Sequence, residues 1–204
     1  MELKDRLATK IRDESYGGLL LCGMNWGGAP SNSNEGGWAD FFADDATNKD
    51  IYQPRIKEWF KAWGFPLAPN GQPTILDLAT SQTNLFLDQS KSFAEIGRSE
   101  NDWITALNLL ADTIQSLQIS AVLILSSTLV RDVDWYARRC EVKLWHHVMG
   151  KNLDWTDKKH GRLKLRFVNK SLVSTANICH PRSCPTAHDL SSSFSDMNSC
   201  VLPR

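Results

Sequence analysis

Short apolar runs alternate with segments of helical periodicity along this chain. The runs comprise residues 19–22, 74–80, 121–125 and 173–179. Short continuous apolar runs are typical of strands buried on both faces of a parallel sheet. Strands that alternate with helices favour an α/β fold. We therefore expect a three-layer α/β/α architecture around a central, mostly parallel four-stranded sheet.

The helices between these strands carry their own signals. Apolar residues recur at helical spacing after Pro54, which suits a first helical turn, and Gly64 closes this stripe. A second helix is expected to begin at residues 100–102, where acidic groups suit the positive end of the helix dipole. Further helices are predicted over residues 5–16 and from Thr128 to Arg139.

Two other segments have less regular patterns. Residues 27–50 are rich in Gly, Asn, Ser and Asp and predict a long ordered loop, a feature that is usually functional in compact domains. Within residues 143–172, the pair Leu144-Trp145 and the alternating stretch 163–167 predict short strands. The expected organisation is a single domain, 1–204, with a short β insertion around residues 143–172.

Composition and charge narrow the class of protein. The chain has 204 residues, of which 42% are hydrophobic and 23% charged, with zero formal net charge. No apolar stretch approaches the roughly 18 residues that span a bilayer, and the amino terminus has no apolar signal-peptide core. Five cysteines without a C-x-x-C pair support neither a disulfide framework nor a zinc site. We expect a cytoplasmic monomer with no membrane partner, metal or cofactor.

Two loops that are distant in sequence carry the candidate chemistry. Gly23-Met24-Asn25-Trp26-Gly27-Gly28 follows the first apolar run, and His180-Pro181-Arg182-Ser183 follows the last. Loops at the carboxyl ends of parallel strands meet in one crevice, where ligands bind. The Asn25 amide and the His180 imidazole are therefore expected to face one small molecule. Such a pair suits positioning of a water and stabilisation of a leaving anion.

These motifs, taken in order, resemble the uracil-DNA glycosylase superfamily. The resemblance rests on Gly23-Met24-Asn25, a turn-rich loop with aromatics, Thr83-Asn84-Leu85 at a predicted strand end, and His180-Pro181-x-Ser183. It extends from about residue 17 to residue 190. The most similar branches are the single-strand-selective monofunctional and the mismatch-specific glycosylases.

The resemblance implies a role for each matched residue. His180 corresponds to the histidine that contacts the base and stabilises its departing anion, and Asn25 to the asparagine that positions the attacking water. Asn84 corresponds to the amide that reads the pyrimidine edge, next to Gly23 and Met24 in the base pocket. An aromatic residue of the long loop would stack on the extruded base, and the candidates are Phe41, Phe42 and Trp38.

DNA contacts are expected at two places. Arg182 and Ser183 follow His180, and a guanidinium there suits a phosphate or a wedge into the base stack. Lys158, Lys159 and Arg162 belong to a locally basic stretch, which suits either a DNA contact or a solvated hairpin.

The expected activity is that of a monofunctional glycosylase. Neither motif contains a lysine, so no Schiff-base lyase step is expected, and an abasic site is the product. Trp26 stands where the family has proline, and Arg182 is added to the His-Pro-Ser loop. The substrates compatible with these departures are uracil, a 5-modified uracil or a bulky modified cytosine of phage DNA, in repair or in antiviral defence. A catalytically silent binding module and a nucleoside or nucleotide N-glycosidase remain as alternatives.

Overall fold

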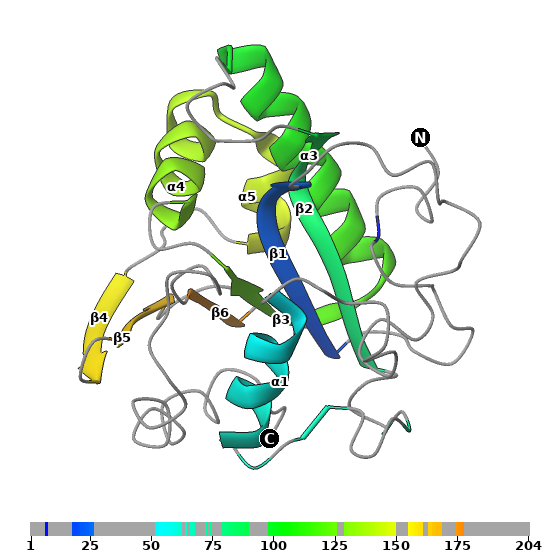
Figure 1. The fold of residues 1–204 in the computed structure, drawn as a ribbon. Coiled ribbons are helices and arrows are strands. Elements are labelled where there is room, and N and C mark those ends of the chain that lie inside the picture. Colours follow the sequence, from blue (N-terminus) through cyan, green and yellow to red (C-terminus); the bar gives the residue numbers. More distant parts are fainter. Residues whose placement is uncertain are drawn as a thin grey trace.

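The computed structural model describes part of the chain, and the fold rests on that part. The described residues are 7, 18–26, 52–62, 64, 66–67, 72, 74, 79–89, 98–125, 129–149, 155–160, 163–168 and 174–177. They form an α/β fold with a parallel sheet, as the alternation of apolar runs and helical segments predicts (Figure 1). Among them, no helix combines the length and apolarity that crossing a membrane requires.

Within the described part of the chain, the sheet has six strands rather than the predicted four. Their order is β2 (Thr80–Gln89), β1 (Gly18–Trp26), β3 (Ile119–Ile124), β6 (Ser174–Asn177), β5 (Leu163–Val168) and β4 (Trp155–His160). The first four are parallel, whereas β5 runs antiparallel to both β6 and β4. The count of four was too low because the hairpin β4–β5 does not stand apart from the sheet: Phe167 pairs with Ala176 of β6 and so extends it.

Two strands differ from the predicted bounds, and the reason is pairing between them. β1 continues to Trp26 instead of ending at Cys22, and β2 begins only at Thr80, where the predicted strand ends. The register Leu19↔Thr80 through Asn25↔Phe86 keeps both strands extended over this length. Hydrogen bonding to a parallel neighbour can thus hold polar residues in a strand that an apolar pattern alone would not predict.

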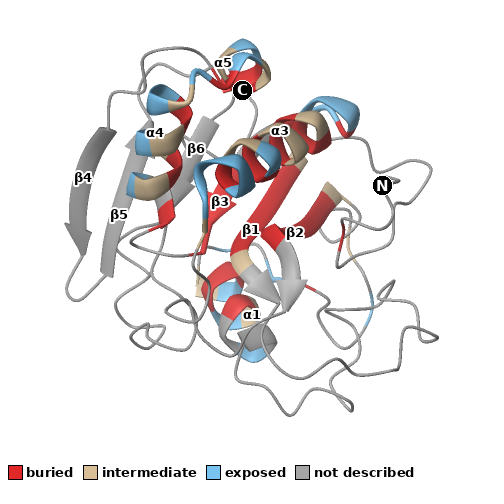
Figure 2. Ribbon diagram, turned by 90° about the horizontal axis from the view of Figure 1, so that it is seen from above, coloured by how far each residue is buried: buried red, intermediate tan, exposed pale blue. Residues whose placement is uncertain are grey.

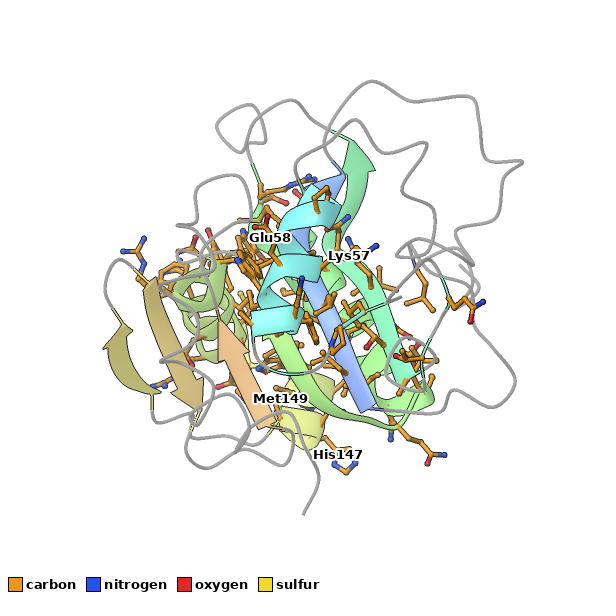
Figure 3. All side chains as sticks on the ribbon, turned by 60° about the horizontal axis from the view of Figure 1, so that its bottom comes forward. Lys57, Glu58, His147 and Met149 are labelled. Carbon is orange, nitrogen blue, oxygen red and sulfur yellow. The ribbon has the colours of Figure 1, made fainter. Side chains whose placement is uncertain are left out.

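The described helices are α1 (Tyr52–Ala62), α3 (Glu100–Ser116), α4 (Leu129–Arg139) and α5 (Lys143–Met149). The predictions for α1, α3 and α4 are confirmed, but the strand predicted at Leu144-Trp145 is wrong. Trp145, Val148 and Met149 are buried at spacings of three and four residues, so a helix buries them on one side. Figure 3 shows His147 and Met149 on this helix, with Met149 buried and His147 exposed.

Local capping explains why α3 begins at Glu100. The Ser99 hydroxyl accepts a hydrogen bond from the Asp102 N–H at 3.3 Å, and the Ser99 N–H donates to the Asp102 carboxylate at 2.8 Å. This reciprocal pair satisfies backbone donors that the first helical turn leaves open. The Ser99 N–H and the Ser99 hydroxyl both donate to the Asp102 carboxylate, and these two hydrogen bonds hold its pKa below the usual value. Sequence reasoning placed the start of this helix correctly but missed Ser99 as its cap.

The hydrophobic core lies against both faces of the sheet. Leu20 and Cys22 belong to one buried cluster with residues of α3, including Trp103 and Leu107. Leu19 and Leu21 alternate with them along β1 and are equally buried, at 1% and 0% exposure, on the other face. Figure 2 shows α3, α4 and α5 on one side of the strands and α1 on the opposite side. The buried residues of α1 are Ile56, Trp59 and Phe60.

Leu7 contacts the outer edge of the sheet. It forms an isolated antiparallel bridge with Thr83 and is buried in the same cluster as Leu85. The prediction of a helix is therefore wrong at this residue, because the unpaired edge of β2 offers it backbone partners. The rest of the segment 5–16 lies outside the described residues, as does the predicted loop 27–50.

Gly18 is a position where only glycine fits. Its φ is +87°, and a Cβ built there would lie 2.6 Å from the Ala79 carbonyl oxygen. We expect Gly18→Ala to lower the free energy of unfolding by about 2 kcal/mol, since left-handed strain adds to a backbone overlap. Urea unfolding measures the loss.

Gly64 provides the matched control for this substitution. Its φ is +86°, yet a Cβ at this position would have nothing within 4 Å of it. Gly64→Ala should therefore cost only the conformational strain, about 1 kcal/mol. Equal losses for the two variants would contradict the overlap at Ala79.

Candidate active site at the carboxyl end of the sheet

The pairing of β1 with β2 brings predicted site residues together. Gly23 lies opposite Asn84, which lies in the middle of β2, and Asn25 lies opposite Phe86, one residue before β1 ends. The backbones of Asn25, Gly23 and Asn84 therefore lie side by side on adjacent strands. The Met24 side chain packs against the core cluster that includes α3, and this packing fixes the position of Met24.

Asn84 is the best-described polar group of this region. It is only 8% exposed and ends a run of five buried polar residues, Thr80 to Asn84. A side-chain amide can donate and accept hydrogen bonds at once, so a ligand that carries both kinds of group would match Asn84. Asn84 lies inside β2 rather than in a loop after it, which corrects the predicted strand end.

The backbone of β1 is irregular at the predicted catalytic residue. Asn25 pairs with Phe86, but the next residue, Trp26, pairs with Gln89, so the register shifts between them. Such irregularities bend a strand and change the direction of its side chains, and they are frequent next to active sites.

The other parallel strands end at the same level. Cys22 lies opposite both Thr83 and Ile124, and Ile124 lies opposite Asn177 of β6. The Leu125 N–H donates to the Cys22 carbonyl at 2.8 Å, which fixes the end of β3 against β1. β6 ends at Asn177, three residues before His180 in the chain.

Several predicted residues lie outside the described part of the chain. They are His180, Arg182, Ser183, Trp38, Phe41, Phe42 and Arg162. Lys158 and Lys159 lie on β4, at the opposite edge of the sheet from β2. Four strand spacings separate β4 from β1, a distance of about 19 Å.

Burial controls the chemistry of the thiol at this level of the sheet. Cys22 is buried, and the loss of solvation raises its pKa to about 12. Its thiol therefore stays protonated at neutral pH and lies 3.5 Å from the Gly23 carbonyl as a weak donor. Because the thiolate is the nucleophilic form, Cys22 does not serve as a nucleophile.

Sequence reasoning missed two residues beside Asn25. Phe86 pairs with it across the strands, and the Arg98 guanidinium lies 4.2 Å from the centre of the Phe86 ring. The signal for Arg98 was present in the chain, because the S-x-x-D capping pattern at Ser99 puts the preceding residue at the start of α3. Pairing of Phe86 with Asn25 required the register of the sheet, which no local pattern contains.

Metal coordination has no candidate in the described part of the chain. No three His, Cys, Asp or Glu residues of that part lie close enough together to hold an ion. His146 and His147 are consecutive residues of α5. Consecutive helical side chains point in different directions.

Comparison with models of known protein families gives no match for this chain, and comparison with curated protein sequences gives none.

Proposed function

We propose that this protein is a monofunctional DNA glycosylase of the uracil-DNA glycosylase type, with a three-layer α/β/α domain. It hydrolyses the N-glycosidic bond of uracil or a modified pyrimidine extruded from DNA. The observation that carries the proposal is the strand pairing that brings Gly23 and Asn25 of β1 next to Asn84 of β2. The ends of β3 and β6 lie at the same level, and His180 follows β6.

In the proposed pocket, Asn84 reads the base. One amide both donates and accepts hydrogen bonds, which matches the alternating O and N–H groups on a pyrimidine edge. Gly23 beside it has no side chain, so a flat base can approach the backbone closely. Extrusion of the nucleotide costs a few kcal/mol, and these contacts offset part of that cost.

Asn25 and His180 carry the proposed bond cleavage. Asn25 positions a water whose oxygen bonds to C1′ of the sugar. The C1′–N1 bond breaks, its electron pair leaves with the base, and the water loses a proton to solvent. His180 donates a hydrogen bond to the base oxygen on which negative charge develops, an interaction that counts most in a dry pocket.

The expected reaction products depend on which nucleophilic groups are inactive or missing in the two motifs. Cys22 is protonated at neutral pH, and neither motif contains a lysine. A Schiff-base intermediate with the sugar therefore has no lysine to form it in these motifs. The proposed products are therefore the free base and an abasic site in an intact strand.

An oligonucleotide panel tests the proposal. It contains uracil, 5-hydroxymethyluracil, mismatched thymine, and 5-hydroxymethylcytosine with and without glucose, each in single and double strands. Abasic sites are revealed by alkali or heat. We expect strand cleavage with at least one of these bases and none with unmodified, fully paired DNA.

Asn84 variants connect the activity to the described site. Asn84→Asp replaces the donor half of the amide by a carboxylate, so excision should fall by about 100-fold or more. Asn101→Asp makes the same change at an exposed residue of α3 and should leave the rate unchanged. Base-dependent binding without cleavage would instead identify a catalytically silent module, and cleavage of free nucleosides alone would identify a nucleoside N-glycosidase.

A further inference from the structure

One face of α4 presents an exposed tryptophan among arginines. Arg131, Trp135, Arg138 and Arg139 are spaced by four, three and four residues around Trp135, so they share one side of the helix. The opposite side is buried through Leu129, Val133 and Ala137. Trp135 is 49% exposed and is the exposed large hydrophobic residue of the described chain.

Arg131 and Arg138 reach further into solvent than the acids beside them. The Arg131 and Arg138 side chains are 74% and 54% exposed, whereas their partners Asp132 and Asp134 are 23% and 19% exposed. Arg139 pairs with Glu100, and it too uses its Nε atom for the contact. A guanidinium has five N–H donors in a planar fork, so the Nε contact uses only one of the donors of Arg131 and of Arg139.

A continuous set of ring contacts connects this face to Phe86 of β2, the backbone pairing partner of Asn25. Phe86, opposite Asn25, meets Trp103 edge to face, and Trp103 stacks on Tyr136 with an angle of 9° between their planes. Tyr136 in turn meets Trp135 edge to face. The successive centroid separations are 5.0, 4.3 and 4.5 Å, so the Trp135 ring lies at most about 14 Å from the Phe86 ring.

We propose that this face of α4 binds unpaired DNA next to the target nucleotide, an inference that rests on the proposed function and specifies its substrate. The Arg139 guanidinium lies 4.9 Å from the centre of the Trp135 ring, so a base stacks on the other face of the indole, and the arginines bind the adjoining phosphates. Aromatic rings combined with arginines are the common means of holding single strands without sequence preference. Paired bases keep their flat faces inside the duplex. An indole on a convex helix face can therefore stack only on unpaired bases.

The dimensions of the face fit a short segment of strand. Arg131 and Arg139 are eight residues apart on the helix, which corresponds to about 12 Å. Stacked nucleotides rise about 3.4 Å each, so the face spans three to four of them. The distance of at most about 14 Å from Trp135 to Phe86 corresponds to about four further nucleotides. A strand bound on this face therefore lies adjacent to an extruded base.

Fluorescence anisotropy with a labelled oligonucleotide of unmodified bases tests the inference without requiring catalysis. Trp135→Ala should weaken binding of the single strand by roughly 5- to 100-fold and change duplex binding little. Trp135→Phe should restore most of the affinity. The triple change Arg131→Gln, Arg138→Gln and Arg139→Gln should reduce the slope of log K against log salt by about 2.

Lys143→Gln is the control for loss of a positive charge away from this face, because Lys143 is exposed but lies on α5. It should leave single-strand affinity within about two-fold of wild type. Single-strand binding by Trp135→Ala within two-fold of wild type would overturn the inference. A changed sedimentation coefficient of Trp135→Ala without DNA would also overturn it, because the face would then be a contact between copies of the chain.

The two proposals fail in different ways. If no base in the panel is excised but single-strand binding depends on Trp135, the glycosylase assignment is wrong and the binding face stands as a single-strand site. If a base is excised and Trp135→Ala binds and excises like wild type, the glycosylase stands and the α4 face is not part of it.

Discussion

Asn25→Ala and His180→Ala are each expected to lower the rate of base excision by at least 100-fold while leaving stability nearly unchanged. Loss of one preorganised donor to a developing anion costs about 10²–10³ in rate, which applies to His180. Loss of a group that positions the attacking water costs about 10²–10⁴, which applies to Asn25. Single-turnover assays on the best base of the panel measure both effects on the chemical step.

The activity of the double variant shows whether Asn25 and His180 share one role or act independently. Because Asn25 acts on the water and His180 on the leaving base, the double variant should lose far more activity than either single variant, down to the uncatalysed rate. Asn101→Ala, which removes an exposed amide from α3, is the control and should excise at the wild-type rate. Full activity of Asn25→Ala in a folded protein would remove the first motif from the mechanism.

Trp103→Ala is expected to cause the largest loss of stability, about 3–5 kcal/mol. The indole is 2% exposed, stacks on Tyr136 at 4.3 Å and meets Phe86 at 5.0 Å. Its removal leaves a cavity between α3, α4 and β2 and breaks two aromatic contacts worth about 0.5–1.5 kcal/mol each. Urea unfolding, with comparison of midpoints at a constant m value, measures the loss.

Trp135→Ala is the natural comparison for Trp103→Ala. It removes the same side chain from a contact with the same Tyr136 ring, but at a position that is 49% exposed. We expect it to cost about 1 kcal/mol or less, because little apolar surface is newly exposed to water. A loss for Trp103→Ala no larger than that for Trp135→Ala would show that the ring contacts do not stabilise the fold.

The sequence alone determined the elements that local physics specifies. The stripe Ile56, Trp59 and Phe60 with a glycine after it predicted α1, because burial at helical spacing and a left-handed closing residue are both local signals. The acidic residues at the start of α3 and the apolar run of β3 were equally clear local signals for a helix and a strand. The parallel α/β class followed from the order of these elements, because parallel neighbours require crossover connections.

The sequence predicted only part of the candidate site. That residues near the ends of β1 and β2 approach one another was predictable, since parallel strands end at a common edge. That Gly23 lies opposite Asn84, and that both lie within strands, was not predictable. A shift of one residue in register would have paired Gly23 with a different neighbour, and no signal within either segment specifies that choice.

Only the tertiary structure decided the remaining features. The polar run Thr80 to Asn84 forms a strand because β1 supplies its backbone partners, and the segment 163–168 joins the sheet because β6 is available to it. The rings from Phe86 to Trp135 come from three elements and meet through the packing of α3 against β2 and α4. Capping and periodicity act between residues a few positions apart, so the sequence reveals them directly. Strand partners and aromatic contacts join residues that are far apart in the chain, and the free energy that selects them arises only when the whole core packs.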